Sequence, residues 1–175
     1  MSLSAPLPTE YDAGLSKYLA GAPAGDVLAL LAEQATEVAA LFGGLAEAQS
    51  AYRYAVGKWS LKDLLQHLTD VERIFTYRCL RIGRGDTTPL PGFDDNAFAE
   101  SARADSRPVA ALVEDFQAAR ASSLALFRSL PKEAWLRPGS SNGRALTARC
   151  IPYFALGHAT HHLAVARERY LPGLR

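Results

Sequence analysis

Histidines are the residues of this sequence best suited to chemistry, and the chain has four of them: His67, His158, His161 and His162. Three fall within one short run, Gly157-His158-Ala159-Thr160-His161-His162. At about 100° per residue of an α-helix, His158 and His162 lie roughly 40° apart around the axis and one turn apart along it, and His158 and His161 about 60° apart. Either pair could offer two imidazoles to one metal ion, so spacing alone does not choose between them.

Two of these histidines fall on apolar helical stripes and are therefore expected to face a core. The stripes are Leu64, His67, Val71 and Ile74, and Ile151, Phe154, His158 and Val165. Neutral imidazoles gathered in an apolar core would carry unsatisfied ring nitrogens, and a divalent cation would satisfy them. The pattern favours a metal site over four separate hydrogen-bonded core histidines. It does not predict a metallopeptidase of the His-Glu-x-x-His type, because the position after His158 is Ala159.

Helical periodicity between clear breakers predicts the elements that must position these side chains. The expected helices begin at Val27 after the cap Asp26, at the capping box Ser60 to Asp63, after Pro108, and near Thr147. The first keeps its periodicity to Leu45 with a loosening at Gly43-Gly44, and the others end near Ile82, Leu130 and Tyr170. Pro152 either kinks the last helix or marks its true start. Strand-like alternation is not evident, and two long connections, one holding residues 87–96 and one over residues 131–144, exclude a simple up-down-up-down course. The expected fold is all-α, a four-helix bundle with long crossover loops.

Length and composition bound the classes of function. The 175 residues fit one domain, 1–175, and 19 Lys and Arg against 18 Asp and Glu leave a formal charge of +1. We therefore expect no nucleic-acid partner and no membrane partner, since neither a basic surface nor an apolar run of about 20 residues is present. The first residues lack a secretory signal, and Cys79 and Cys150 are expected to be buried, reduced thiols, so the predicted location is cytoplasmic.

Several segments together resemble the DinB superfamily. They are residues 52–68 around His67, residues 70–75, the loop residues 90–97, residues 157–170 and the early Glu10-Tyr11-Asp12. The likeness covers nearly the whole chain and is closest to YfiT-like metal-dependent hydrolases and bacillithiol-transferase-like members. It implies an up-down-down-up four-helix bundle, a homodimer, and a zinc or nickel ion held by three histidines. Carried over to this chain, those ligands are His67, His158 and His162, with His161 as a neighbour of the site or as a residue that contacts a ligand rather than the ion.

A site of three neutral histidines leaves the ion its full charge and one open position, which is typical of catalytic metal sites. Water there would give a hydrolase, and a thiol would give a thiol S-transferase acting on a small-molecule electrophile with a low-molecular-weight thiol. Many members of the family have glutamate where this chain has Ala159, so no carboxylate follows His158 to serve as a base. We therefore expect thiol transfer ahead of hydrolysis.

Other polar side chains are candidates for supporting roles. Asp63 and Asp70 flank His67 by one turn each and could orient its ring, although a cap and a surface charge are the simpler interpretation. Asp95 and Asn96 could close over the cleft, or belong to a polar turn that caps a short helix. Arg78 and Arg149 could bind the carboxylates of an acidic thiol, although the simpler interpretation, which we expect, is that both are exposed to solvent. Two alternatives to an enzyme stay open: a non-catalytic metal-binding module, such as a metal-stabilised or stress-response protein, and a metal-free helical interaction protein.

Overall fold

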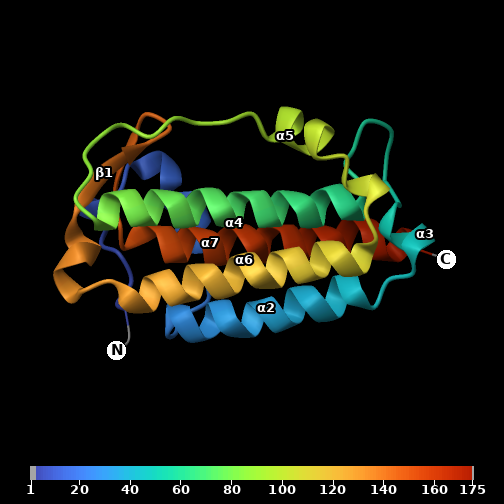
Figure 1. The fold of residues 1–175 in the computed structure, drawn as a ribbon, viewed down its shortest axis with the longest axis horizontal. Helices are drawn as coiled ribbons and strands as arrows, with labels where there is room; N and C mark the ends of the chain where they lie inside the picture. The colour runs from blue at the N-terminus through green and yellow to red at the C-terminus, as the bar shows by residue number, and fades with distance from the viewer. Residues whose placement is uncertain (1–2, 175) are drawn as a thin grey trace.

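Four long helices form the body of the protein in the computed structural model, which describes residues 3–174 except for the side chains of residues 17 and 18. They are α2 (Val27–Gly43), α4 (Leu61–Gly83), α6 (Val109–Ser129) and α7 (Cys150–Val165). Figure 1 shows them side by side along the longest axis of the molecule. The predicted all-α four-helix bundle is confirmed.

The direction of the four helices follows an up-down-down-up course. In Figure 1, α2 and α7 run one way along the bundle, and α4 and α6 run the other. Two consecutive parallel helices need a connection that returns along the whole bundle, and residues 84–108 make it. This connection carries the short helix α5 (Asp95–Ala102) across the outside of α4. The long loop therefore lies over the helix that holds His67.

Helix starts follow the side chains that the sequence offers as caps. Asp26 accepts a hydrogen bond from the Leu28 amide at 3.0 Å at the start of α2. At the start of α4, the Ser60 hydroxyl accepts from the Asp63 amide, and Asp63 accepts from the Ser60 amide at 2.9 Å. Each such cap satisfies a backbone donor that the first turn leaves free and stabilises the helix by about 1 kcal/mol.

A two-stranded hairpin departs from the prediction of a purely irregular connection over residues 131–144. Strands β1 (Pro138–Ser141) and β2 (Arg144–Thr147) pair antiparallel. Asn142 and Gly143 form the turn with φ values of 51° and 71°, which is the Asn-Gly signature of a tight hairpin. Because β2 includes Thr147, α7 begins later than expected, and Pro152 lies in its first turn, where proline is tolerated.

Shorter elements close the two ends of the bundle. They are α1 (Ser16–Ala20), α3 (Glu47–Ser50), the 3-10 turns Pro8–Glu10, Ala13–Leu15, Ala104–Ser106, Lys132–Leu136 and Leu171–Gly173, and a π-helical turn, Ala166–Tyr170, that continues α7. Among the helices of residues 3–174, none is long and apolar enough to cross a membrane. Cys79 and Cys150 are buried and free, as predicted, and burial raises the pKa of Cys79 to about 12.

A buried ionic network joins all four long helices. Arg120 of α6 makes a two-pronged ion pair with Glu72 of α4, with nitrogen–oxygen distances of 2.9 and 3.0 Å. Arg120 also donates to the Leu31 carbonyl and the Gln34 side chain of α2. Gln34 in turn donates to the Leu156 carbonyl of α7 at 3.1 Å. The network ties α7 to the helices around it.

Candidate metal centre

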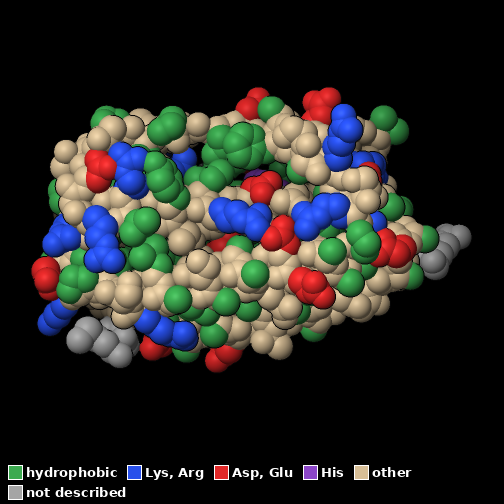
Figure 2. All heavy atoms as spheres, in the orientation of Figure 1, with side chains coloured by type: hydrophobic (Ala, Val, Ile, Leu, Met, Phe, Trp, Pro, Cys, Tyr) green, Lys and Arg blue, Asp and Glu red, His purple; other side chains and the backbone are tan. Residues whose placement is uncertain are grey.

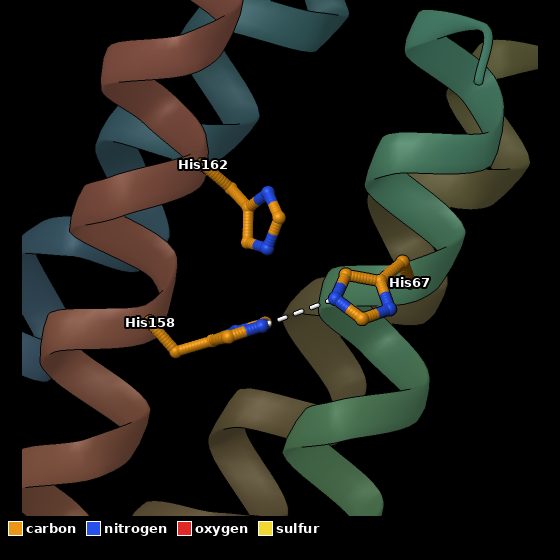
Figure 3. A group of neighbouring side chains, drawn as sticks. All are labelled: His67, His158 and His162. Carbon is orange, nitrogen blue, oxygen red and sulfur yellow. Dashed lines mark hydrogen bonds between the residues drawn. The ribbon is translucent and has the colours of Figure 1, made fainter. Parts of the chain in front are cut away.

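Three histidines meet between α4 and α7. His67 comes from α4, and His158 and His162 come from successive turns of α7. One ring nitrogen from each lies within 4.8 Å of the others, and Figure 3 shows the rings pointing toward one another. The structure thus brings together the three side chains that were expected to share a metal ion.

The contacts among these rings suit a shared cation. His67 Nε2 lies 3.0 Å from His158 Nε2. When both rings are neutral and act as metal ligands through Nε2, each of these two nitrogens carries a lone pair, and the two lone pairs face each other. Two nitrogens that bind one zinc ion at 2.0–2.1 Å in tetrahedral geometry lie roughly 3.3 Å apart, close to this separation. Figure 3 shows Nε2 of His162 turned toward the other two rings, whereas its Nδ1 points away from them and is buried, with no hydrogen-bond partner among the described side chains. Neutral imidazoles fit zinc and nickel as ligands.

Burial keeps the three imidazoles in their neutral form. The pKa of His67 is lowered by burial, although the charge of Asp95 acts against this shift. Burial and the neighbouring histidines lower the pKa of His158 well below its usual value, and the pKa of His162 to about 3. Neutral rings offer the lone pairs that a metal needs, so at neutral pH no proton has to leave before a cation binds.

A carboxylate of the loop helix approaches the far side of one ring. Asp95 Oδ1, in the first turn of α5, lies 3.9 Å from Nδ1 of His67. Asp94 caps this helix through the amides of Asn96 and Ala97, and so fixes where Asp95 lies. The segment is therefore both a capped short helix and a neighbour of the site. The other face of the His67 ring packs on Trp59, with centroids 4.7 Å apart.

Of the remaining polar candidates, Asp63 and Asn96 lie away from the ring cluster, and His161 lies at its edge. Asp63 accepts hydrogen bonds from Arg53 and from the Ser60 amide, so it acts as a cap rather than a partner of His67. Asn96 lines a separate surface pocket together with Asp63. His161 is exposed on α7, where its ring contacts that of His162 with centroids 5.1 Å apart.

A cavity of about 260 Å³ leads from the surface to His158. Its walls include Val71 and Phe75 of α4, Phe93 of the loop and Phe154 of α7. Figure 2 shows the surface hollowed between α4 and the loop that carries α5, with histidine visible inside. A small organic molecule could thus reach His158, the member of the three-histidine cluster that lines the cavity.

Arg78 and Arg149 were predicted to be exposed, and both are mostly buried. Arg78 is only 8% exposed and lines this cavity, whereas Arg149 is largely buried in an ion pair with Glu10. Arg78 lies eleven residues after His67, a spacing that brings both side chains to one face of α4. The helical stripe could have located Arg78 from sequence, but the loop that buries it could not be placed.

Comparisons with known proteins identify the family and the fold of this chain. A family model described as the DinB superfamily matches residues 30–166. A search of curated proteins found no match. Among solved structures, YfiT from Bacillus subtilis, described as a probable metal-dependent hydrolase with an unusual four-helix bundle topology, aligns with a TM-score of 0.73 at 18% identity, covering 81% of this chain and 84% of YfiT. A mycothiol-dependent maleylpyruvate isomerase aligns with a TM-score of 0.68 at 14% identity, covering 90% of this chain and 66% of the isomerase. At such identities, the two structures establish the fold alone.

Proposed function

The chain belongs to the DinB superfamily, and on that premise we propose that it is a divalent-metal-dependent enzyme whose ion is held by His67, His158 and His162. The observation that carries the proposal is the convergence of one nitrogen from each ring within 4.8 Å. Zinc and nickel are the ions proposed, because both take neutral imidazole ligands. When bound, the ion would supply the Lewis acidity that makes a thiol or a water molecule nucleophilic near neutral pH.

The chain's own residues would hold and shield the reacting groups. Asp95 would accept a hydrogen bond from Nδ1–H of His67 and so direct Nε2 of that ring toward the shared site. Trp59 would limit the rotation of the same ring by packing on its face. Phe75 and Phe93 would exclude water from an organic substrate in the cavity. In this arrangement, proton transfer from the nucleophile would end in solvent at the cavity mouth.

Thiol S-transfer is proposed ahead of hydrolysis. A water nucleophile needs a nearby base, and the one carboxylate found within 4.0 Å of these ring nitrogens in residues 3–174 is Asp95, on the far nitrogen of His67. Position 159 offers no carboxylate because it is an alanine, and that alanine is buried in the bundle core. The name of the mycothiol-dependent neighbour is consistent with a small thiol as co-substrate. The substrates would then be a small electrophile and a low-molecular-weight thiol.

Elemental analysis tests the first part of the proposal. Protein made without a histidine tag and without added metal should carry about one equivalent of zinc or nickel per chain. Absence of a stoichiometric ion would refute the proposal, and would favour a metal-free helical interaction protein.

Turnover tests the second part. The metal-loaded protein, mixed with bacillithiol or other small thiols and an electrophilic dye, should form thioether faster than the chelated protein. A bound ion without metal-dependent turnover across the thiol panel would instead support a non-catalytic metal-binding module. The homodimer also stays a prediction, which light scattering of the same sample would check.

A further inference from the structure

Arg78 is a buried cation in the wall of the cavity that reaches His158. Its Nη2 donates to the Pro91 carbonyl at 2.8 Å, and its guanidinium lies 5.9 Å from the centre of the Phe93 ring. Within residues 3–174 it makes no ion pair, although it is only 8% exposed. Burial alone lowers the pKa of Arg78, with no nearby carboxylate opposing the shift.

Other arginines of the protein show how unusual this is. Arg120 is still more deeply buried, at 1% exposed, but it is held by both oxygens of Glu72. Arg144 lines the same cavity as Arg78, but it pairs with Asp12 at 3.2 Å. A buried charge without a counterion is costly. One carbonyl and one aromatic face use only part of a group that has five N–H donors.

The position of Arg78 relates it directly to the histidine cluster. His67, Val71, Phe75 and Arg78 follow one face of α4, and the last three line the cavity. The separation of eleven positions from His67 to Arg78 corresponds to about 16 Å along the helix. Side chains of a helix lean toward its N-terminus, which for Arg78 is the direction of His67 along α4. A ligand could thus contact both groups at once.

We propose that Arg78 binds a carboxylate of the substrate, so that the enzyme acts on an acidic ligand whose reacting group lies toward His158 and whose anionic end lies at Arg78. A guanidinium fork matches the two oxygens of a carboxylate. Apolar side chains of the lining, such as Val71, Phe75 and Phe154, suit an aliphatic or aromatic linker, and the one acidic side chain in the lining is Asp95, which lies beside His67. The placement of the ligand's reacting group toward His158 rests on the proposed function. The anion site itself depends only on the cavity and Arg78.

Carboxylate binding to the metal-free protein tests the anion site separately from any reaction. Calorimetry would compare hexanoate with hexanamide, which have the same length but differ in charge. Wild-type protein should bind hexanoate at least tenfold more tightly. Arg78→Gln should remove this preference, whereas Arg144→Gln, a cavity arginine that already has a counterion, should keep it.

Two results would overturn the proposal: equal binding of hexanoate and hexanamide by the wild-type protein, or a preference that survives in Arg78→Gln. Circular dichroism would check that the variant folds, because Arg78 also contacts the loop at Pro91. If Arg78→Gln is unfolded, Arg78→Lys keeps the charge but loses the fork. It should retain a reduced preference for hexanoate, and an unchanged one would overturn the proposed two-oxygen contact.

Turnover then identifies which substrate carries the carboxylate. One arm compares mercaptohexanoate with mercaptohexanamide toward a neutral alkyl bromide, and the other compares bromohexanoate with bromohexanamide toward a neutral thiol. In each, the C–S bond forms as the C–Br bond breaks, bromide leaves with the electron pair, and the thiol proton goes to solvent. If the carboxylate form gives a higher kcat/KM than the amide in one arm, and Arg78→Gln removes that gain, the substrate varied in that arm is the one that carries the carboxylate. Hexanoate binding without turnover in either arm would support the anion site and count against the proposed function.

Discussion

Asp95 of α5 and His67 of α4 face each other across the loop-to-bundle boundary, with Oδ1 3.9 Å from Nδ1. The carboxylate is half exposed and the imidazole is buried, so the contact joins a surface element to the interior. Asp95 comes from the 84–108 connection, which exists because α4 and α6 run parallel. The unusual course of the bundle therefore places an acidic side chain behind a candidate metal ligand.

Asp95→Asn should weaken metal binding while leaving the fold intact. Partners of a ligating histidine typically contribute 10- to 100-fold in metal affinity, so a loss of about this size is expected in a competition titration with a chelating dye. Asn96→Ala is the matched control, since Asn96 is exposed on the same short helix and lines a different pocket. Equal affinities of Asp95→Asn and wild type would show that Asp95 does not orient His67.

Alanine variants of the four histidines test which of them bind the metal ion, with His161, on the exposed side of α7, as the control. Replacing His67, His158 or His162 by Ala should each reduce bound metal, measured by elemental analysis, to below about a tenth of an equivalent. His161→Ala should retain wild-type metal, because that ring points to solvent and only touches His162. Loss of metal in His161→Ala would contradict this ligand set.

Much of the fold could be predicted from sequence because the long helices carry strong local signals. Asp26 and the Ser60–Asp63 box cap helices where expected. The hairpin β1–β2 was missed because its strands are short and lack β-branched alternation, although Asn142-Gly143 is a turn signal. Its pairing depends on partners far away in the chain, such as Leu90 beside Ser141 and Tyr11 beside Leu146. Local sequence does not encode such contacts.

The candidate site was predictable in part for the same reason. Periodicity relates the histidines of the last helix to one another, and the apolar stripes direct His67 and His158 into the core, whereas the choice of His162 over His161 as the third ligand depended on family resemblance. The role of Asp95 and the burial of Arg78 both depend on the path of the 84–108 loop. The Arg120–Glu72–Gln34 network was not foreseen, because charged residues are usually expected at the surface.

The metal-free protein should lose stability as the pH falls below about 6.5. The pKa of His162 is about 3 in the folded protein and near 6.5 when unfolded, so between these values the unfolded chain binds more protons and is favoured. At pH 5 this one group lowers the free energy of unfolding by about 2 kcal/mol relative to pH 7. His67 and His158 act in the same direction, since their pKa values are also lowered.

Thermal denaturation of chelated samples at pH 7 and pH 5 measures this effect. His162→Gln should show a smaller decrease in Tm over the same range, because glutamine does not titrate. His161→Gln, at the exposed neighbouring position, should behave as wild type. An identical pH dependence in wild type and His162→Gln would contradict the explanation.

Arg120→Met should destabilise the bundle more than any surface change. Arg120 is 1% exposed and Glu72 3%, so removing the guanidinium leaves a buried carboxylate without its counterion. The expected loss is about 3–5 kcal/mol, or roughly 6–20 °C in Tm for a chain of this size. The double variant Arg120→Met with Glu72→Leu removes both charges and should recover much of that loss, since an apolar pair can replace a buried ion pair at little cost. Gln34 would still join α2 to α7 through Leu156 in both variants. If the double variant were as unstable as the single one, the loss would come from packing, and the ion pair would not be what holds α4 and α6 in register.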